Sequence, residues 1–161
     1  MADTDRLFTD HRTGVFRYLC RLVGHTESAR DLTQEVFLRV TRAGLPETDA
    51  GGERAWIFRI ARNLGLNFLR DGARRPSMPM PLHFVEPGSA PTQELSLVLA
   101  EALAALADID RDVFLMREVG GLSYDEIASA SDLTTTAVRS RLHRARQQLR
   151  AALAPALRQT P

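Results

Sequence analysis

The 161-residue chain contains a single cysteine and no lysine. Cys20 alone cannot form an internal disulfide, and one thiol is too few for a structural zinc site, so neither kind of cross-link is expected to stabilise the fold. All 21 basic residues are arginine. Because arginine and lysine both bind phosphate well, this bias indicates a GC-rich genome rather than a particular ligand.

A long hydrophobic run and a recognisable catalytic pattern are also missing. No apolar stretch approaches the roughly 18 residues of a membrane span, and the start MADTD is acidic where a signal peptide is basic. We therefore expect a cytoplasmic protein with no membrane insertion of its own. The four histidines are scattered, and no paired-carboxylate, His-Cys or Gly-rich phosphate-loop spacing occurs, so we expect no enzymatic activity, no cofactor and no metal site.

The net charge of +1 hides an uneven distribution of charge along the chain. Residues 1–75 hold 13 Arg against 10 acids, residues 76–133 hold 2 Arg against 10 acids, and residues 134–161 hold 6 Arg and no acid. Two basic blocks on either side of an acidic one suggest two separate surfaces for a polyanion. The acidic block either limits indiscriminate binding of DNA or faces a protein partner.

Five of the eight prolines fall within residues 76–92, PSMPMPLHFVEPGSAPT, which predicts a flexible Pro-rich linker. Apolar spacing on both sides is helical, and no period-two run is present. The fold class expected is therefore all-α, with two small helical domains. Helices are expected at about 4–22, 26–43, 54–70, 93–106, 109–119, 123–131 and 135–153.

Each expected helix of the first domain has an apolar stripe that should face the core. In the helix over 4–22 the stripe comprises Phe8, His11, Val15, Leu19 and Leu22. In the helices over 26–43 and 54–70 the stripes comprise Ala29, Leu32, Val36, Val40 and Ala43, and Ile57, Ile60, Ala61, Leu64 and Phe68.

The strongest local signal lies in residues 122–150, LSYDEIASASDLTTTAVRSRLHRARQQLR. Ser123 and Glu126 form a capping box that starts one helix, a break follows at 131–133, and a Thr run caps a longer helix. This is the pattern of a helix-turn-helix unit. Opposite the apolar stripe of Val138, Leu142, Ala145 and Leu149, the second helix carries Arg139, Ser140, His143, Arg144 and Gln147. A face with arginines and no acid suits the major groove, although a basic face can also be merely solvated.

Two further helix faces are candidates for binding. The helix over 26–43 presents Leu38 among Asp31, Gln34, Glu35 and Arg42, an arrangement typical of a protein-binding patch, but taken alone it favours a single exposed leucine. The helix over 54–70 presents Arg59, Arg62, Asn63, Leu66 and Arg70, with Trp56 and Asn67 at its edge. Arginines and amides together suit single-stranded nucleic acid, whereas burial of Trp56 between helices is favoured over base stacking.

Three stretches together resemble a known family: ARDLTQEVFLRV, RAWIFRIARNLGLNFLR and LADIDRDVFLMREVGGLSYDEIA followed by TTTAVRSRLHRARQQLR. In order and spacing they are similar to the extracytoplasmic-function (ECF, group 4) sigma factors of bacterial RNA polymerase, of the sigma-70 family. The resemblance implies a sigma region 2 domain over residues 1–75, a linker over 76–93 and a sigma region 4 domain over 94–161.

The resemblance also implies roles for individual residues. Region 2 would bind the beta-prime clamp helices of core RNA polymerase, and region 4 the beta flap. The core-binding positions fall on Asp31, Leu32, Gln34, Glu35, Phe37 and Leu38. The loop over 45–53 would receive a flipped base of the minus-10 element, whose strand would contact Arg59, Arg62, Asn63 and Asn67. The minus-35 positions fall on Thr136, Arg139, Ser140, His143 and Arg144.

A transcription initiation factor of this kind would join two weakly binding modules through a tether, which multiplies their affinities for promoter DNA. The resemblance further implies an anti-sigma factor that occludes the same faces. Three departures from the family pattern stand out: Asp132 lies where the turn usually has Gly, Ser131 where an apolar residue is usual, and Asn67 where Asp is common. The alternatives are a helix-turn-helix repressor or activator that is not a sigma subunit, and a pure interaction protein that binds no DNA.

Overall fold

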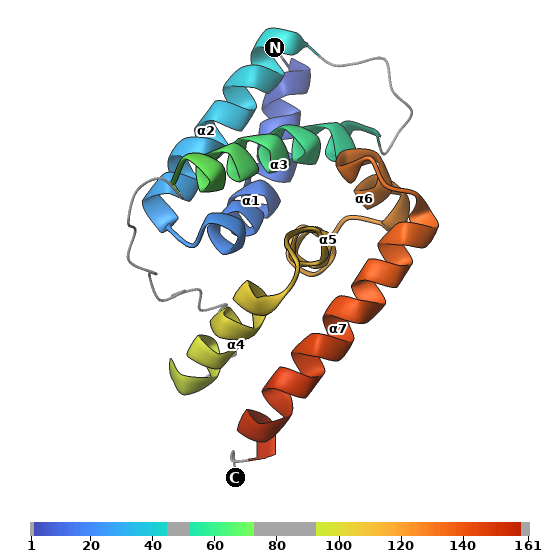
Figure 1. Cartoon of the computed structure of the whole chain (residues 1–161). Helices are drawn as coiled ribbons and strands as arrows, with labels where there is room; N and C mark the ends of the chain where they lie inside the picture. Colours follow the sequence, from blue (N-terminus) through green and yellow to red (C-terminus); the bar gives the residue numbers. More distant parts are fainter. Residues whose placement is uncertain (1, 45–51, 73–92, 159–161) are drawn as a thin grey trace.

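The computed structural model describes residues 2–44, 52–72 and 93–158, and these segments form seven α-helices and no strand (Figure 1). This confirms the all-α prediction. The linker predicted over 76–92 and most of the loop over 45–53 lie outside the described residues. The helices are α1 (Ala2–Val23), α2 (Thr26–Ala43), α3 (Gly52–Gly72), α4 (Gln93–Ala105), α5 (Asp108–Glu118), α6 (Tyr124–Ser131) and α7 (Thr135–Arg158).

The helix boundaries follow local capping chemistry. Gly24 and Gly44 end α1 and α2 with a φ of 72°, which glycine adopts without steric cost. His25 is the N-cap of α2, and its Nδ1 accepts the backbone N–H of Ser28 at 3.1 Å. Gly52 already belongs to α3, and α7 continues through Pro155 to Arg158, five residues beyond the predicted end.

Helices α1, α2 and α3 pack on one another as the N-terminal bundle. Leu7, Val15 and Leu19 of α1 are fully buried there, together with Val36 of α2 and Ile57 of α3. Gly65 permits the close contact of α3 with α1, because a Cβ at this position would lie 2.6 Å from Leu22 Cδ2.

The predicted stripes of this bundle were wrong at their margins. Phe68 is 36% exposed and Phe8 is 40% exposed, although the Phe8 ring still packs edge-on against Phe37 at 5.1 Å between centroids. Ala43, in the last turn of α2, is exposed. Trp56 packs against the core and is partly buried, as the sequence favoured.

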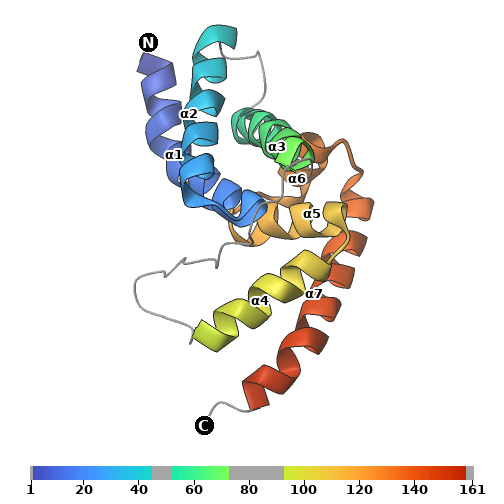
Figure 2. The ribbon, with the colours of Figure 1, turned by 60° about the vertical axis from the view of Figure 1, so that its left-hand side comes forward.

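Helices α4 to α7 form the C-terminal domain, in which α7 is the long element against which α4, α5 and α6 pack. Its apolar stripe of Val138, Leu142, Ala145 and Leu149 is buried, which confirms the helical spacing of the sequence. Figure 2 shows α5 lying between the N-terminal bundle and α7, with α4 alongside α7.

The N-terminal bundle and the C-terminal domain are in direct contact. Helix α3 lies across α6, and α1 contacts α5 (Figures 1 and 2). Their buried residues form one continuous hydrophobic cluster. Phe58 of α3 packs against Gly120, where an added Cβ would lie 2.8 Å from Phe58 Cε1. The sequence predicted two bundles joined by a tether and did not foresee this shared core.

Candidate nucleic-acid interface

The turn between α6 and α7 has the geometry of a helix-turn-helix. Both hydrogen bonds of the predicted capping box are present at the start of α6: Glu126 N–H donates to Ser123 Oγ at 3.1 Å, and Ser123 N–H donates to Glu126 Oε1 at 3.0 Å. Asp132 ends α6 in the left-handed conformation, with φ 55° and ψ 40°. Thr134 Oγ1 then accepts Ala137 N–H at 3.1 Å and starts α7.

Asp132 is therefore a tolerated replacement for the glycine that the family pattern favours. Asp and Asn enter the left-handed region more readily than other residues that carry a Cβ. It is the one non-glycine residue with positive φ in the described part of the chain. The turn that directs α7 away from α6 is thus formed by the residue that departed from the pattern.

The predicted minus-35 positions share one exposed face of α7. We call this set the recognition face: Thr136, Arg139, Ser140, His143 and Arg144, all of which are exposed. The face is held from behind by Asp110, a buried carboxylate of α5 that accepts a hydrogen bond from Arg141 at 2.9 Å. Arg144 lies 3.7 Å from the other oxygen of Asp110 and remains 59% exposed.

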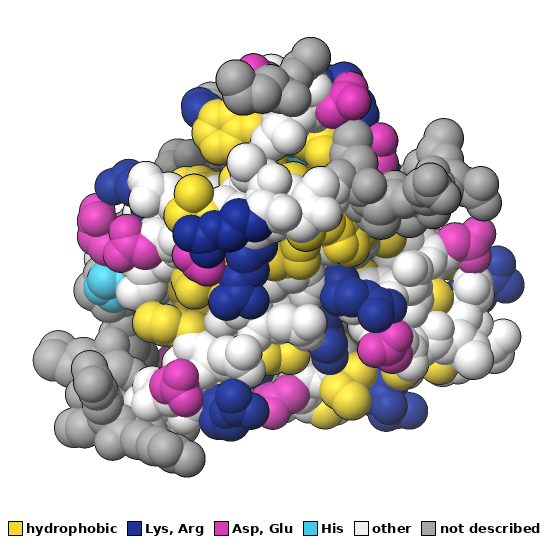
Figure 3. Space-filling model, turned by 90° about the horizontal axis from the view of Figure 1, so that it is seen from above, with side chains coloured by type: hydrophobic (Ala, Val, Ile, Leu, Met, Phe, Trp, Pro, Cys, Tyr) yellow, Lys and Arg dark blue, Asp and Glu magenta, His cyan; other side chains and the backbone are white. Residues whose placement is uncertain are grey.

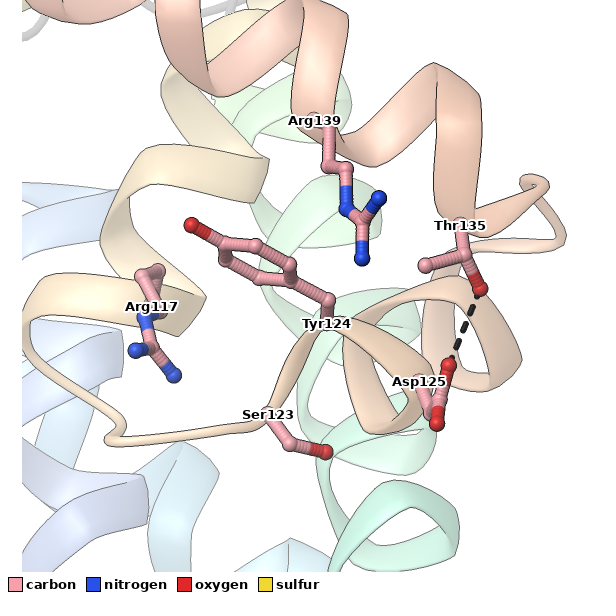
Figure 4. Close-up of a pocket in the computed structure, with 6 residues that line it drawn as sticks. All are labelled: Arg117, Ser123, Tyr124, Asp125, Thr135 and Arg139. Atoms are coloured by element: carbon pink, nitrogen blue, oxygen red, sulfur yellow. Dashed lines mark hydrogen bonds between the residues drawn. The ribbon is translucent and has the colours of Figure 1, made fainter.

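Beside the recognition face lies an open pocket of about 300 Å³ that the sequence did not reveal (Figure 4). The Tyr124 ring lies between two guanidinium groups, 5.0 Å from that of Arg117 and 5.8 Å from that of Arg139. The residues lining the pocket are Arg117, Ser123, Tyr124, Asp125, Thr135 and Arg139. They come from α5, α6 and α7 and the segment before α6, so no spacing in one segment could have identified them.

The predicted minus-10 residues lie on α3 but face different surroundings. Asn63 and Asn67 are exposed, and Asn67 accepts a hydrogen bond from Arg70 at 2.9 Å. Arg59 and Arg62 instead face the C-terminal domain. Arg59 pairs with Asp132 at 2.9 Å and also donates to the carbonyl of Ser129.

Arg62 reaches Asp112, a carboxylate of α5 that is 1% exposed and also accepts the hydroxyl hydrogen of Tyr18. Burial raises the pKa of Asp112, against the lowering effect of the Tyr18 hydrogen bond and the Arg62 charge. The pKa of Tyr18 is raised by its own burial and by the neighbouring carboxylate. Tyr18, Arg62 and Asp112 thus connect α1, α3 and α5.

Arg54, at the start of α3, makes a contact of two hydrogen bonds with the C-terminal domain. Its Nε and Nη2 donate to Glu126 Oε2 and Oε1 at 2.7 and 2.6 Å. Burial alone would raise the pKa of Glu126, but the hydrogen bonds from Arg54 and Ser123 outweigh it and lower the pKa.

Figure 3 shows the molecule from above. Basic side chains lie there beside acidic and apolar ones, and no continuous basic surface is seen on the face drawn.

The predicted core-binding positions form the α2 patch: Asp31, Leu32, Gln34, Glu35, Phe37 and Leu38. Asp31 and Gln34 are exposed, and Leu38 is 50% exposed. Glu35 pairs with Arg39 at 3.0 Å. Leu32 is half-buried and Phe37 is buried, so these two residues support the patch from beneath rather than form its surface.

The described residues hold no group of three or more His, Cys, Asp or Glu side chains that could bind a metal ion. His25 Nδ1 is engaged in capping α2, and burial raises the pKa of the Cys20 thiol to about 11. None of the helices in the described ranges is long and apolar enough to cross a bilayer.

Two family models match the chain in sequence order. Residues 7–75 match Sigma-70 region 2, and residues 96–149 match Sigma-70, region 4. The first match ends near the expected domain boundary at residue 75. The second contains α5, α6 and most of α4 and α7, including the recognition face.

Curated relatives are RNA polymerase sigma factors. The ECF RNA polymerase sigma factor SigE of Mycolicibacterium smegmatis is 35% identical over 96% of this chain and 63% of the relative. SigL of Mycobacterium tuberculosis, also an ECF RNA polymerase sigma factor, is 31% identical over 91% of this chain and 86% of the relative. The chain spans 51% of a third relative, the probable ECF sigma factor SigI of Mycobacterium tuberculosis, so several relatives are considerably longer.

Two solved structures share the fold. The sigma factor RpoE of Bartonella quintana, in complex with the anti-sigma factor NepR, superposes with a TM-score of 0.77 at 20% identity and covers 96% of this chain and 98% of that chain. CnrH, in complex with the cytosolic domain of CnrY, superposes with a TM-score of 0.69 at 24% identity and covers 94% of this chain and 88% of that chain.

Proposed function

The chain belongs to the extracytoplasmic-function group of the sigma-70 family, and from this premise we propose that it binds core RNA polymerase and directs it to specific promoters. The observation that carries the proposal is the recognition face. Five positions chosen from sequence lie together on one exposed, acid-free face of a helix that follows a capped partner helix across a tight turn. This is the arrangement by which a helix enters the major groove.

At the minus-35 element, α7 would read bases and the pocket beside it would hold the DNA backbone. Arg139 and Arg144 can donate two parallel hydrogen bonds to a guanine edge, and Ser140 and His143 supply shorter polar groups. Arg117 and Arg139 lie on either side of the Tyr124 ring in this pocket (Figure 4), and their guanidinium groups are suited to phosphate, although Asp125 also lines it. Phosphate contacts fix the register in which the base contacts are made.

At the minus-10 element, α3 would bind the separated non-template strand. Asn63 and Asn67 are exposed and can reach base edges. Arg59 and Arg62 are paired with carboxylates of the C-terminal domain, so these two residues must exchange their acidic partners for phosphates when DNA is bound. The proposed order is therefore domain separation first and strand binding second.

The α2 patch would dock on the beta-prime clamp helices. An exposed leucine surrounded by an acid and an amide is a suitable centre for a polar helical partner. Region 4 would bind the beta flap, and an anti-sigma factor would occlude one or both surfaces. The factor would act in the cytoplasm, and the bond-forming chemistry would remain with the polymerase.

The test combines purified chain, core RNA polymerase and fragmented genomic DNA, and maps the transcripts that start. Transcripts with shared upstream elements at the minus-10 and minus-35 positions are expected in the presence of the chain and absent with core enzyme alone. A repressor or activator that is not a sigma subunit would bind DNA without binding core enzyme. Absence of a complex with core polymerase would therefore reject the sigma function.

A further inference from the structure

The two arginines of the recognition face are supported in different ways. Arg139 lies against the Tyr124 ring, with 5.8 Å between its guanidinium carbon and the ring centroid (Figure 4). Arg144 lies instead beside a carboxylate, since its Nη1 is 3.7 Å from Asp110 Oδ2. Asp110 is not part of the recognition face, because it belongs to the first turn of α5 and is 1% exposed. A buried acid of one helix therefore faces an exposed arginine of another.

The two carboxylate oxygens of Asp110 have different surroundings. Oδ1 accepts a hydrogen bond from Arg141 Nη1 at 2.9 Å. Oδ2 is buried and accepts no hydrogen bond from the described residues, and the Arg144 guanidinium lies just beyond hydrogen-bonding distance of it. A buried carboxylate oxygen without a hydrogen bond is unfavourable, so Oδ2 attracts the guanidinium of Arg144.

The spacing along α7 brings both arginines to this one acid. Arg141 and Arg144 are three residues apart and are therefore neighbours on the helix surface. The side chain of Arg141 is 30% exposed, whereas that of Arg144 is 59% exposed. Arg141 fixes the carboxylate of Asp110, and the fixed carboxylate restrains Arg144. A chain of contacts thus runs from the interior of the C-terminal domain to its recognition face.

A guanidinium group can bind a carboxylate and a base at the same time. It is planar and carries five N–H donors, of which a guanine edge takes two. With Nη1 of Arg144 turned toward Asp110, the donors on Nε and Nη2 are left for a base. Restraint before binding also reduces the side-chain entropy that a long exposed arginine loses when it meets DNA.

We propose that Asp110 is a positioning residue for the minus-35 contact. It holds the Arg144 guanidinium in one orientation on the recognition face, and thereby sets how strictly the chain selects the base pair that Arg144 contacts. Asp110 acts through Arg144 and does not itself touch DNA. Arg139 rests on Tyr124, so its selectivity is independent of Asp110. The inference rests on the proposed function only in that α7 reads duplex DNA.

The test variant is full-length Asp110→Asn, which removes the charge and keeps an oxygen that can accept the hydrogen bond of Arg141. The matched control is Glu118→Gln, on the same helix. Glu118 also pairs with α7, through Arg146 at 2.7 Å, but neither residue of this pair belongs to the recognition face. The two variants change the net charge equally, so non-specific attraction to DNA phosphates changes equally.

The measurement is base discrimination by the full-length chain. A duplex is selected from a randomised pool with the wild type, and each of its base pairs is then substituted in turn. Fluorescence anisotropy gives the Kd for each duplex, and the ratio of the substituted to the selected duplex gives the discrimination at that position. Both affinities in a ratio come from one preparation, so an unfolded fraction cancels. Arg144→Ala and Arg139→Ala identify the base pair that each arginine reads.

Asp110→Asn is expected to reduce discrimination at the Arg144 base pair by on the order of tenfold and to leave that at the Arg139 base pair unchanged. Glu118→Gln should leave discrimination at the Arg144 base pair unchanged. In the Arg144→Ala background, Asp110→Asn should have no further effect on discrimination. Full discrimination at the Arg144 base pair would overturn the proposal. Equal losses at both base pairs would also overturn it, because Asp110 would then only hold α7 on α5.

A second variant, Arg141→Gln, keeps the test decisive if Asp110→Asn does not fold. It removes the hydrogen bond that fixes Asp110, so Arg144 is drawn toward the carboxylate and discrimination at its base pair should fall. Its matched control is Arg146→Gln, 35% exposed, which removes an ion pair between the same two helices and should leave that discrimination intact. Equal discrimination in these two variants would contradict the positioning role.

Binding of the wild-type chain to core polymerase tests the sigma role separately. Absence of that complex would reject the proposed function. The comparison of base pairs uses the chain and duplex DNA alone, so it would still decide whether Asp110 positions Arg144.

Discussion

At the scale of single residues, three carboxylates fix how neighbouring helices are placed. Asp110 holds α7 on α5 through Arg141, Asp112 is shared by Tyr18 and Arg62, and Asp132 forms the turn before α7. None of these acids lies on the recognition face. Their common property is that each fixes the position of an arginine or of a backbone segment that the proposed function requires.

Glu126 allows this role to be tested by pH. Its pKa is lowered in the folded chain, so it stabilises the fold fully above the pKa of an unfolded glutamate, about 4.3, and less as the pH falls through the folded value. Denaturant unfolding should show Glu126→Gln to be less stable than wild type by about 1 kcal/mol at pH 7. This difference should shrink steadily as the pH is lowered below about 4.

The same titration on Glu101→Gln, at an exposed position of α4, is the control. Its difference from wild type should stay near zero at every pH. A Glu126→Gln difference that is constant with pH would show that the Arg54 contact does not depend on the carboxylate charge.

At the scale of elements, α7 and α2 each present one face to solvent and are expected to act separately. The recognition face of α7 is supported by a buried stripe and by Asp110, and the α2 patch by buried Phe37. Because each surface rests on its own packed helix, a surface change on one should leave the other intact.

For α7, the double change Arg139→Ala with Arg144→Ala should abolish minus-35-dependent transcription while binding to core polymerase persists. A good bidentate contact to a base contributes about 1–3 kcal/mol, so the loss of two should weaken promoter binding by tenfold or more. Asp110 stays paired through Arg141, so the fold should be retained. Promoter binding is measured with the holoenzyme, and Arg150→Ala with Arg158→Ala, at exposed positions nearer the end of α7, serves as control.

For α2, the double change Asp31→Ala with Gln34→Ala should weaken binding to core polymerase by about tenfold, as expected for the loss of an interface hot spot. The DNA contacts of the C-terminal domain should be unaffected. Titration of labelled core enzyme gives the affinity, and Arg30→Ala, exposed on the same helix and paired locally with Glu27, is the control. Unchanged core affinity would exclude this part of α2 from the interface.

At the scale of the whole molecule, the two family domains behave as one packed unit in the free chain. Their buried residues form one cluster, and at the junction Tyr18 donates a hydrogen bond to Asp112 while Phe58 packs against Gly120. A shared core couples the stability of one half to that of the other. The full chain should therefore unfold in a single cooperative transition.

Phe58→Ala tests this coupling because it removes a side chain that is 1% exposed at the junction. It should destabilise the chain by about 3–5 kcal/mol, the usual cost of deleting a buried aromatic ring. It should also make the unfolding of the two halves separable in calorimetry. Phe68→Ala, on the same helix but 36% exposed, should cost about 1 kcal/mol or less and leave one transition. Similar effects of the two changes would argue against a shared core.

The sequence by itself determined the secondary structure and the recognition face of this protein. Helical periodicity, the capping box at Ser123 and the buried stripe of α7 are local, since they depend on residues within one or two turns of each other. The α2 bounds and the exposure of Arg139 and His143 followed for the same reason. The family pattern then assigned roles to faces that periodicity had already defined.

Only the tertiary structure decided how the two halves meet. The pairing of Arg62 with Asp112 joins residues 50 positions apart, and that of Arg54 with Glu126 joins residues 72 apart. No periodicity within a helix can specify which of many acids lies opposite a given arginine, because that depends on shape and burial across an interface. The sequence shows that basic and acidic blocks are present, and only the packing of α3 against the C-terminal domain decides which arginine of the first block pairs with which acid of the second.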